Sequence, residues 1–573
     1  MITEVVTFFG IVQGVGFRPT LSRIAAKHRM KGQVRNMGAF VQLIVTDEPE
    51  RIDTFIEAVR AGKPRMADII RIDREIVDAV RFDDFRIVSS AAAEDEIATV
   101  PADIAVCDEC LAEFRDPSDP RYLHPFISCT NCGPRYTILE RLPYDRGTTT
   151  MEDFPMCAFC EGEYVDPASR RYHAQTVSCH DCGPRALWSP GKARTPQRAS
   201  NPDADVATGK QGRAFLCSDA DISAAIDAIA KGDVIALKGV GGYYLACDPC
   251  DEAAIRNLRD VKVREHKPFA VMFASIEQVR EYCEVNAVEE TLLTSPKRPI
   301  VLLEQRREPP SCYSDDPFDK LAKRAGVRTA CSMSPWDIPL LNKRGSDTTF
   351  APRDKIVPSP FVPFAEGAMS TSRFVGAFLP SMALQYLLVE ALGPLIMTSA
   401  NISDLPIICD DGEMFSAAER DERVAGVLYN ERRIARRLDD SVTRVIDGTP
   451  QIIRRAKGWT PVPIYVRGTD RLSKDDQILA AGADLKNAFA LTKGSFVYLS
   501  QHIGDMNNIE TEKVYEENLK DMRSFFGIEP GVVAYDLHPL YRTTDRAKGY
   551  DGVELLPVQH HHAHVASVMA EHG

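Results

Sequence analysis

Long apolar runs and an excess of basic residues are both missing from this 573-residue sequence. Because no run reaches the roughly 18 apolar residues that a membrane helix needs, we expect no segment to span a membrane. The net charge of −13 argues against electrostatic binding to a phosphate backbone, so we expect no nucleic-acid partner. No apolar signal peptide opens the sequence, which favours a cytoplasmic, reducing location.

Cysteine, in contrast, is concentrated between residues 107 and 182. Eight cysteines form two sets with the same spacing, Cys-x2-Cys-x18-Cys-x2-Cys, and the flanking segments repeat as well. Two Cys-x2-Cys turns can place four thiolates at the corners of a tetrahedron, which suits a structural Zn²⁺ ion. The pattern predicts a duplicated zinc-finger domain over residues 101–188 with two zinc ions. The expected ligands are Cys107, Cys110, Cys129, Cys132, Cys157, Cys160, Cys179 and Cys182.

Two alternatives to the zinc interpretation are a disulfide framework and ordinary buried thiols. A histidine could also replace one thiolate, because His124, His173 and His180 lie near the second cysteine pairs. His180 is the weaker candidate, since it sits inside a Cys-x2-Cys turn. Cys247 and Cys250 have no second pair at a usable spacing, and we interpret them as a coincidence.

Residues 1–90 have the pattern of a β-α-β-β-α-β, ferredoxin-like sandwich. Gly14 and Gly16 allow the backbone after the first strand to curl, so that N–H groups converge on an anion at a helix N-terminus. The segments "GIVQGVGFRP" and "GQVRNMGAF" resemble acylphosphatase. The resemblance implies that Arg18 is the main phosphate ligand and that Asn36 positions the attacking water. The phosphate-binding loop comprises Gln13, Gly14, Val15, Gly16 and Phe17. The alternative is a regulatory small-molecule domain of the same fold.

After a loose linker over residues 189–210, a helix near residues 222–230 precedes "DVIALKGVGGYYLACD", which we expect to form one strand. The basic run around Lys262 and the later segments "SPKRPIVLL" and "PLIMTSANIS" resemble a YrdC-like α/β domain over residues 211–465. The resemblance implies ATP binding and activation of a carboxylate as an adenylate. It also implies cations that face phosphates, namely Lys238, Lys262, Arg264 and Lys267, and residues that contact nucleotide or carbamate, namely Ser399 and Asn401. Residues 304–378 form an unusual insert that is rich in proline and charge.

Residues 470–573 are expected to form two strands joined by "TKG", a helix and a further strand, with Gly482 and Asp484 at a phosphate or nucleotide turn. His560 and His564 are four residues apart, so on a helix they could share a divalent metal ion, although such a cluster can also be a solvated helix start. The segment resembles the N-terminal part of the actin-like ATPase fold of carbamoyl-transferring enzymes. Because that fold has two lobes and the chain stops after the histidine pair, we expect little final transfer from this form.

The four regions in this order, a multidomain α/β and α+β arrangement, resemble HypF-type carbamoyltransferases of nickel–iron hydrogenase maturation. The family implies that carbamoyl phosphate is cleaved to carbamate, that ATP with Mg²⁺ converts carbamate to carbamoyl adenylate, and that the carbamoyl group passes to the C-terminal cysteine of a HypE-type protein, where it becomes a cyanide ligand. The alternatives are a small-molecule O-carbamoyltransferase and a zinc-scaffolded binding protein that lacks the final transfer step.

Overall fold

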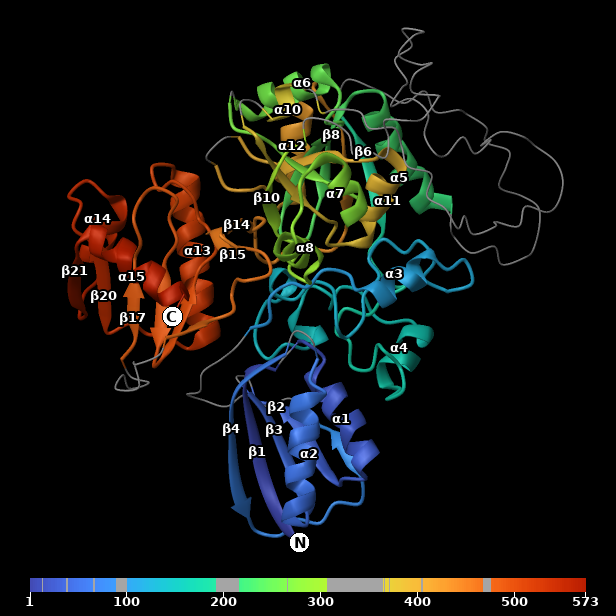
Figure 1. The fold of residues 1–573 in the computed structure, drawn as a ribbon, viewed down its shortest axis with the longest axis vertical. Coiled ribbons are helices and arrows are strands. Elements are labelled where there is room, and N and C mark those ends of the chain that lie inside the picture. Colours follow the sequence, from blue (N-terminus) through green and yellow to red (C-terminus); the bar gives the residue numbers. More distant parts are fainter. Residues whose placement is uncertain are drawn as a thin grey trace, which may run out of the picture.

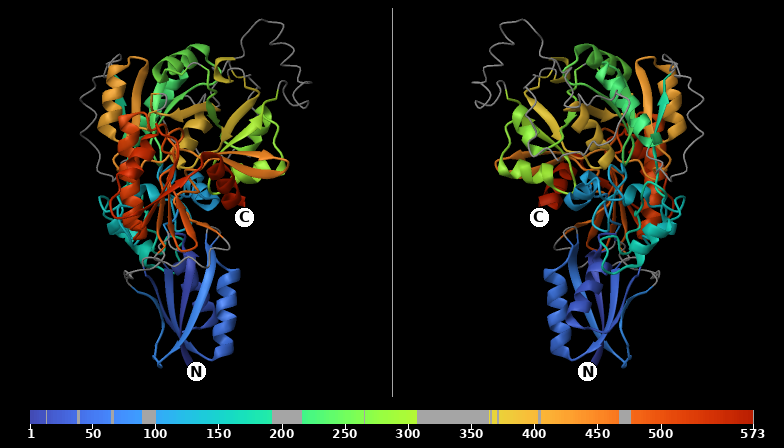
Figure 2. Two further views of the ribbon diagram at one scale, coloured as in Figure 1. Left: turned by 90° about the vertical axis from the view of Figure 1, so that its left-hand side faces the viewer. Right: turned by 90° about the vertical axis from the view of Figure 1, so that its right-hand side faces the viewer.

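The chain folds into four units, of which the one nearest the N-terminus lies at one end and the zinc-finger region lies between it and the largest unit (Figures 1 and 2). The computed structural model describes residues 1–12, 14–37, 40–64, 67–88, 100–191, 216–264, 266–306, 364, 366–369, 372–402, 405–466 and 476–572. Gln13, most of the predicted linker and most of the predicted insert lie outside these residues.

The first unit is a five-stranded sheet, in the order β4-β1-β3-β2-β5, packed against two helices. Its elements are β1 (Ile2–Ile11), α1 (Phe17–His28), β2 (Gly32–Asn36), β3 (Phe40–Asp47), α2 (Pro49–Ala61), β4 (Asp68–Val77) and β5 (Phe85–Ile87). Alternate residues of β1, such as Val6 and Phe8, are buried against apolar helix residues such as Leu21 and Phe55. The predicted ferredoxin-like order is confirmed, and β5 adds a short strand parallel to β2.

The second unit contains two copies of one small structure at an interval of 50 residues. Its elements are α3 (Asp108–Arg115), the 3₁₀ helices η1 (Tyr136–Ile138) and η2 (Arg146–Thr148), α4 (Ala158–Val165) and β6 (Ala186–Pro190). α3 begins directly after Cys107, and α4 begins directly after Cys157. β6 leaves this unit and pairs antiparallel with β13 (Val424–Asn430) of the next unit.

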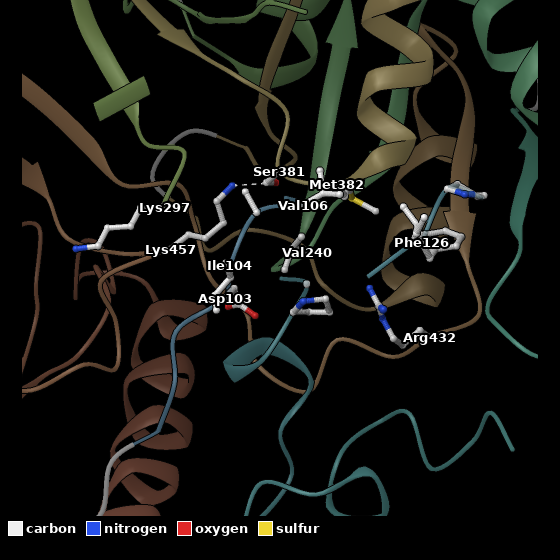
Figure 3. A pocket seen from close by; sticks show the side chains of 15 residues that line it. Asp103, Ile104, Val106, Phe126, Val240, Lys297, Ser381, Met382, Arg432 and Lys457 are labelled. Atoms are coloured by element: carbon white, nitrogen blue, oxygen red, sulfur yellow. Dashed lines mark hydrogen bonds between the residues drawn. The ribbon is translucent and has the colours of Figure 1, made fainter. Parts of the chain in front are cut away.

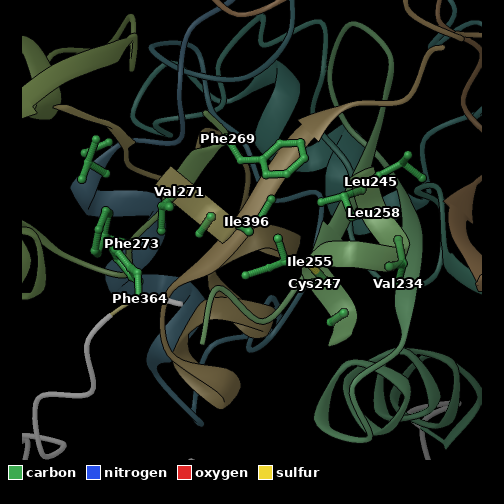
Figure 4. Packing of buried hydrophobic residues seen from close by; sticks show 14 of the residues in the cluster. Val234, Leu245, Cys247, Ile255, Leu258, Phe269, Val271, Phe273, Phe364 and Ile396 are labelled. Carbon is green, nitrogen blue, oxygen red and sulfur yellow. The ribbon is translucent and has the colours of Figure 1, made fainter. Parts of the chain in front are cut away.

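The third unit is built on a ten-stranded mixed sheet with the order β15-β14-β10-β11-β9-β12-β8-β7-β13-β6. Its further elements are α5 (Leu216–Ala230), β7 (Val234–Lys238), β8 (Tyr243–Cys247), α6 (Glu252–Lys262), β9 (Ala270–Met272), α7 (Ile276–Tyr282), α8 (Ala287–Thr294), β10 (Ile300–Glu304), α10 (Glu366–Met369), β11 (Phe374–Phe378), α11 (Ala383–Leu392), β12 (Leu395–Ser399), α12 (Asp411–Arg420), β14 (Val442–Ile446) and β15 (Thr449–Arg454). The core in Figure 4 joins residues of the sheet, such as Val234 and Val271, to helix residues such as Ile255 and Leu258.

The single strand that we expected in "DVIALKGVGGYYLACD" is wrong, because the segment folds back as the antiparallel pair β7 and β8. The turn is closed by the Gly239 N–H, which donates to the Gly242 carbonyl at 2.9 Å. A Cβ atom at Gly239 would lie 2.3 Å from the Tyr244 ring. Glycine is therefore needed for this tight reversal.

The fourth unit has a six-stranded sheet in the order β16-β19-β18-β17-β20-β21. Its elements are β16 (Ile464–Tyr465), β17 (Ile478–Ala480), β18 (Ala490–Lys493), β19 (Phe496–Leu499), α13 (Ile509–Phe526), β20 (Val532–Asp536), α14 (Arg542–Lys548), β21 (Glu554–Val558) and α15 (His560–His572). The hairpin joined by "TKG" is confirmed as β18 and β19. No helix in the described ranges is both long and apolar enough to cross a bilayer.

Candidate functional site

Each cysteine set converges on one point. Within the first set, Sγ atoms are 3.7 Å (Cys107 to Cys129), 3.8 Å (Cys129 to Cys132) and 3.6 Å (Cys132 to Cys110) apart. The second set repeats these distances at 3.6, 3.8 and 3.6 Å. A tetrahedral Zn²⁺ with Zn–S bonds of roughly 2.3 Å has ligand-to-ligand edges of about 3.8 Å. Both sets therefore fit a structural zinc ion whose coordination shell is completed by four thiolates.

The structure favours four-cysteine ligation over a disulfide framework and over a histidine ligand. All eight cysteines are free of disulfides, and the three candidate histidines have other neighbours. The His124 ring lies 3.2 Å from Ser178 Oγ, and the His180 ring lies 3.0 Å from the Tyr122 carbonyl. The His173 ring packs between the edges of two tyrosines. None of the three belongs to the two groups of ligand atoms that converge in the described chain.

Reciprocal contacts hold the two fingers together. Arg121 of the first finger pairs with Glu163 of the second, and Arg171 of the second pairs with Glu113 of the first. Both guanidinium groups are almost completely buried, and both also donate through Nε to a carbonyl of the other finger. Such buried, multiply bonded pairs need each partner, because an unpaired buried charge is costly.

The glycine loop that is predicted to bind phosphate curls into the N-terminus of α1, as described for residues 14–17. Gly14 and Gly16 have φ values of 64° and 77°, in the left-handed region, and α1 starts at Phe17. Val15 and Phe17 are buried in the core and anchor the loop. Arg18 Nη2 lies 3.4 Å from Asp145 Oδ1 of the finger unit, while burial lowers the Arg18 pKa.

Asn36 is the last residue of β2, in the five-stranded sheet of the first unit. Its amide Nδ2 and Oδ1 are buried and make no hydrogen bond within the part of the chain that the structure describes. A buried amide without a partner is costly unless a ligand or water satisfies it. Asn36 itself does not line the cleft described next.

The finger unit closes over the loop and forms one wall of a cleft. Arg135 donates through Nε to the Gly14 carbonyl and through Nη2 to the Thr130 carbonyl at 3.1 Å. A Cβ at Gly16 would lie 2.8 Å from the Thr130 side chain, so the two units are in close contact. Sequence reasoning missed this wall, because its residues come from a different unit. The cleft is lined by Val12, Gly14, Gly16, Phe17, Arg18, Pro19, Thr130, Arg135, Tyr144, His173, Ala174 and Gln175.

In the third unit the structure brings four predicted residues together. Lys262 at the end of α6 donates from Nζ to the Ser399 carbonyl and to Asn401 Oδ1 at 2.8 Å. Ser399 Oγ donates to the same Oδ1 at 2.8 Å, and Arg264 Nη1 lies 3.4 Å from Thr398 Oγ1. Burial, with the nearby Arg264 charge, lowers the pKa of Lys262 to about 7.

Lys238 and Lys267 differ from this group. The buried Lys238 ammonium lies 2.5 Å from Asp411 Oδ1 and 2.9 Å from the Asn430 carbonyl. Its charge is therefore already balanced within the protein. Lys267 lies close enough to Lys262 to lower the pKa of that lysine, and its carbonyl accepts a hydrogen bond from Arg264 Nε at 3.2 Å.

A second cavity lies between the first finger and the third unit (Figure 3). Pro125, Phe126 and Ile127 of the finger line it together with Ser381 and Arg432 of the third unit. Burial lowers the pKa of Arg432 to about 10, so this guanidinium is charged at neutral pH.

In the fourth unit, Asp484 accepts hydrogen bonds from the Arg542 and Thr543 N–H groups at 2.8 and 3.1 Å and so caps α14. His560 Nδ1 lies 2.6 Å from Asp536 Oδ2, and His560 Nε2 lies 3.0 Å from His564 Nε2. A carboxylate that orients one imidazole of a pair is common at metal sites.

Four family models match consecutive parts of the chain. They are acylphosphatase (residues 4–87), HypF finger (106–139 and 156–188), telomere recombination, which is the Sua5, YciO and YrdC model (227–333 and 351–456), and the HypF Kae1-like domain (473–571).

Individual relatives agree with these models. The chain is 37% identical over 589 residues to carbamoyltransferase HypF2 of Cupriavidus necator and 34% identical over 574 residues to a probable carbamoyltransferase HypF of Methanocaldococcus jannaschii. Each alignment covers 98% of this chain, but only 63% and 64% of the relatives. A crystal structure of full-length HypF in a phosphate- and nucleotide-bound form matches with a TM-score of 0.81 and 36% identity, over 100% of this chain and 64% of that one.

The chain thus spans a little under two thirds of the length of these relatives. Within that span it carries the four domain models in succession, and both cysteine sets have the geometry of zinc sites. On this evidence the chain belongs to the HypF family.

Proposed function

We propose that this chain acts in carbamoyl transfer for hydrogenase maturation, with carbamoyl phosphate and ATP as substrates. The observation that carries the proposal is the glycine loop beside Arg18, which is enclosed by the finger unit and lies in the same chain as the cluster around Lys262. An acyl-phosphate site and an adenylating site in one chain suit a substrate that is first cleaved and then activated.

At the first site, the N–H groups of the loop and Arg18 would bind the phosphate group, and Asn36 would orient a water molecule. The water oxygen attacks phosphorus, and the bond between phosphorus and the carbamoyl oxygen breaks with its electron pair on carbamate. The protons of the water pass to phosphate and to solvent. Positioning and neutralisation of charge suffice here, because an acyl phosphate already has a good leaving group.

At the second site, a carbamate oxygen attacks the α-phosphorus of ATP, and pyrophosphate leaves with the electron pair of the broken bond. Lys262, Arg264 and Lys267 would stabilise the developing negative charge, with Mg²⁺ bound to the nucleotide. Ser399 and Asn401 would contact the nucleotide or carbamate. Lys238 stays a weaker prediction, since Asp411 already balances its charge.

We further propose a HypE-type protein as the carbamoyl acceptor, through its C-terminal cysteine thiolate, in synthesis of the cyanide ligand. His560 and His564 would hold a divalent metal in the fourth unit. The 3.0 Å between their Nε2 atoms suits two neighbouring ligands on one ion with metal–nitrogen bonds of about 2.1 Å.

The test is exchange of labelled pyrophosphate into ATP that depends on carbamoyl phosphate. We expect exchange by the wild-type chain and a loss of about 100- to 1,000-fold in Arg18→Ala, the size of effect expected when one charge-stabilising group is removed. Arg23→Ala is the matched control, because Arg23 lies on the same helix but is exposed and bonds only to Thr20 in the described part of the chain. No exchange by the wild type would exclude the proposed sequence of cleavage and adenylation and favour a zinc-scaffolded binding protein. Exchange that survives Arg18→Ala would show that the first unit is not needed for the reaction and would favour the small-molecule O-carbamoyltransferase.

A further inference from the structure

The cleft at the phosphate-binding loop is a composite of two units. The acylphosphatase model ends at residue 87, yet Tyr144, His173 and Gln175 of the finger unit line the same cleft as Gly16 and Arg18. Phosphate binding needs only the loop and the arginine. The opposite wall is therefore available to contact the acyl group.

His173 is held in an unusual conformation on this wall. Its φ of 53° lies in the left-handed region, which non-glycine residues rarely adopt. Its N–H donates to the Tyr164 carbonyl at 2.9 Å, and its carbonyl accepts from Gln175 Nε2 at 3.1 Å. Gln175 Oε1 in turn accepts from the Arg146 N–H at 2.9 Å and from the Tyr164 hydroxyl at 3.2 Å. Several bonds thus stabilise a backbone that would otherwise be disfavoured, as is common at functional sites.

The imidazole of His173 is left as a hydrogen-bond acceptor. Neither ring nitrogen bonds to another residue among those that the structure describes. Burial, with repulsion from the nearby Arg18 guanidinium, lowers the pKa of His173 to about 4. The ring is therefore neutral at pH 7, and one of its nitrogens carries a free lone pair.

Tyr144 supplies the complementary donor on the same wall. Its hydroxyl is buried and makes no hydrogen bond within the described ranges. Burial raises the pKa of Tyr144 against the opposing effect of the nearby Arg135 guanidinium, so the phenol stays protonated. A buried hydroxyl without a partner indicates a missing ligand group or water.

We propose that His173 and Tyr144 form the pocket for the carbamoyl group, so that the second zinc finger sets the acyl specificity of the first unit. The His173 ring accepts a hydrogen bond from the carbamoyl NH₂ group, and the Tyr144 hydroxyl donates to the carbonyl oxygen. Acetyl phosphate has the carbonyl but not the NH₂ group, so only the contact with His173 separates the two substrates. This inference rests on the proposed cleavage of carbamoyl phosphate.

The test compares phosphate release from carbamoyl phosphate and from acetyl phosphate by the whole chain. His173→Leu is the sharpest variant, because Leu123 occupies the equivalent position of the first finger at a φ of 55°. We expect the ratio of kcat/KM for carbamoyl over acetyl phosphate to fall at least tenfold, with acetyl phosphate changed less than threefold. Tyr144→Phe should lower kcat/KM for both substrates by the same factor. Leu123→Met is the matched control and should change neither value.

His173→Asn guards against a purely structural effect, since asparagine tolerates the left-handed region and keeps an acceptor oxygen. It should restore part of the preference, and every variant should retain two zinc ions. Equal losses for both substrates in His173→Leu, or an unchanged ratio, would overturn this inference while leaving the proposed function intact. Failure of the wild type to hydrolyse either substrate would overturn both.

Discussion

The two zinc fingers share their cysteine spacing, their Sγ distances and their reciprocal arginine–glutamate pairs, yet four consecutive residues in the loops before their second cysteine pairs differ. The first finger has Leu-His-Pro-Phe at residues 123–126 and faces the cavity at the third unit. The second has His-Ala-Gln-Thr at residues 173–176 and faces the phosphate-binding loop. Duplication has preserved the scaffold, and the side chains on one loop distinguish an apolar wall from a polar one.

The two metal sites also differ in what surrounds them. Cys110, Cys129 and Cys132 belong to one hydrophobic core with residues of the first and third units, such as Phe17 and Tyr386. Cys160 and Cys179 belong to a small separate core with only Ala174 and Val177 as its other fully buried members in the described chain. Loss of the first zinc ion should therefore disturb the packing of the first and third units, whereas loss of the second should disturb mainly its own finger.

Exchange of one zinc ligand should give the largest effect. We expect Cys110→Ser and Cys160→Ser each to lose one of two zinc ions. Because a structural zinc site contributes roughly 10 kcal/mol or more to folding, each loss should strongly lower the stability of the finger concerned. Cys110→Ser should also weaken the proposed binding of ATP to the third unit, whereas Cys160→Ser should leave it within about twofold, because only the first site shares a core with that unit. Metal analysis, thermal unfolding and calorimetric titration with ATP measure these outcomes. Equal loss of ATP binding in the two variants would show that the fingers are not energetically distinct.

The reciprocal arginines should show where the fingers are alike. We expect Arg121→Met and Arg171→Met each to lower the free energy of unfolding by about 3 kcal/mol, because each removes a buried guanidinium that pairs with a glutamate and donates to a carbonyl of the other finger. Denaturant titration measures both values. Arg115→Met is the control, since its pair with Glu390 is exposed and should contribute less than about 1 kcal/mol. Values that differ by more than twofold between Arg121 and Arg171 would contradict the symmetry.

The smallest expected effect is on stability in acid. It should distinguish the loop that carries His173 from the loop that carries Leu123. Because the pKa of His173 is lower in the folded chain, at about 4, than in the unfolded chain, the unfolded state binds more protons between pH 6.5 and 4. Stability is therefore lost as the pH falls through this window. His173→Leu should remove about 1 kcal/mol of the loss between pH 6.5 and 5, after allowance for solvent screening of this half-buried ring. Leu123→Met should leave the pH profile of the unfolding free energy unchanged, and an identical profile in His173→Leu would refute the prediction.

Local patterns made the fold and the metal sites predictable. The cysteine spacing predicts four ligands in a tetrahedron. The glycines of the phosphate-binding loop indicate a left-handed backbone that other residues rarely adopt. The resemblance to a YrdC-like domain names Lys262, Ser399 and Asn401, which the structure brings together. In contrast, the roles of Tyr144, Arg135 and His173 depend on how the finger unit docks on the first unit. Spacing within one segment carries no information about that contact.

The same limit explains two further differences. Lys238 was expected to face a phosphate, but whether a buried lysine meets a ligand or Asp411 depends on a helix more than 150 residues away. The sequence also predicts a single strand through the glycines after Lys238, with runs of consecutive apolar residues on both sides of them. A buried hairpin and a long buried strand have the same composition.

β6 has a consequence for how the chain is made. This strand lies at the edge of the ten-stranded sheet, where the side chain of Trp188 contacts Gly426 of β13. β13 follows more than 200 residues later, so at a synthesis rate of about 5–20 residues per second β6 leaves the ribosome at least about ten seconds before its partner exists. During that interval the zinc fingers can be complete while their last strand has an unpaired edge, which is the kind of surface that chaperones bind and that aggregates when they are scarce.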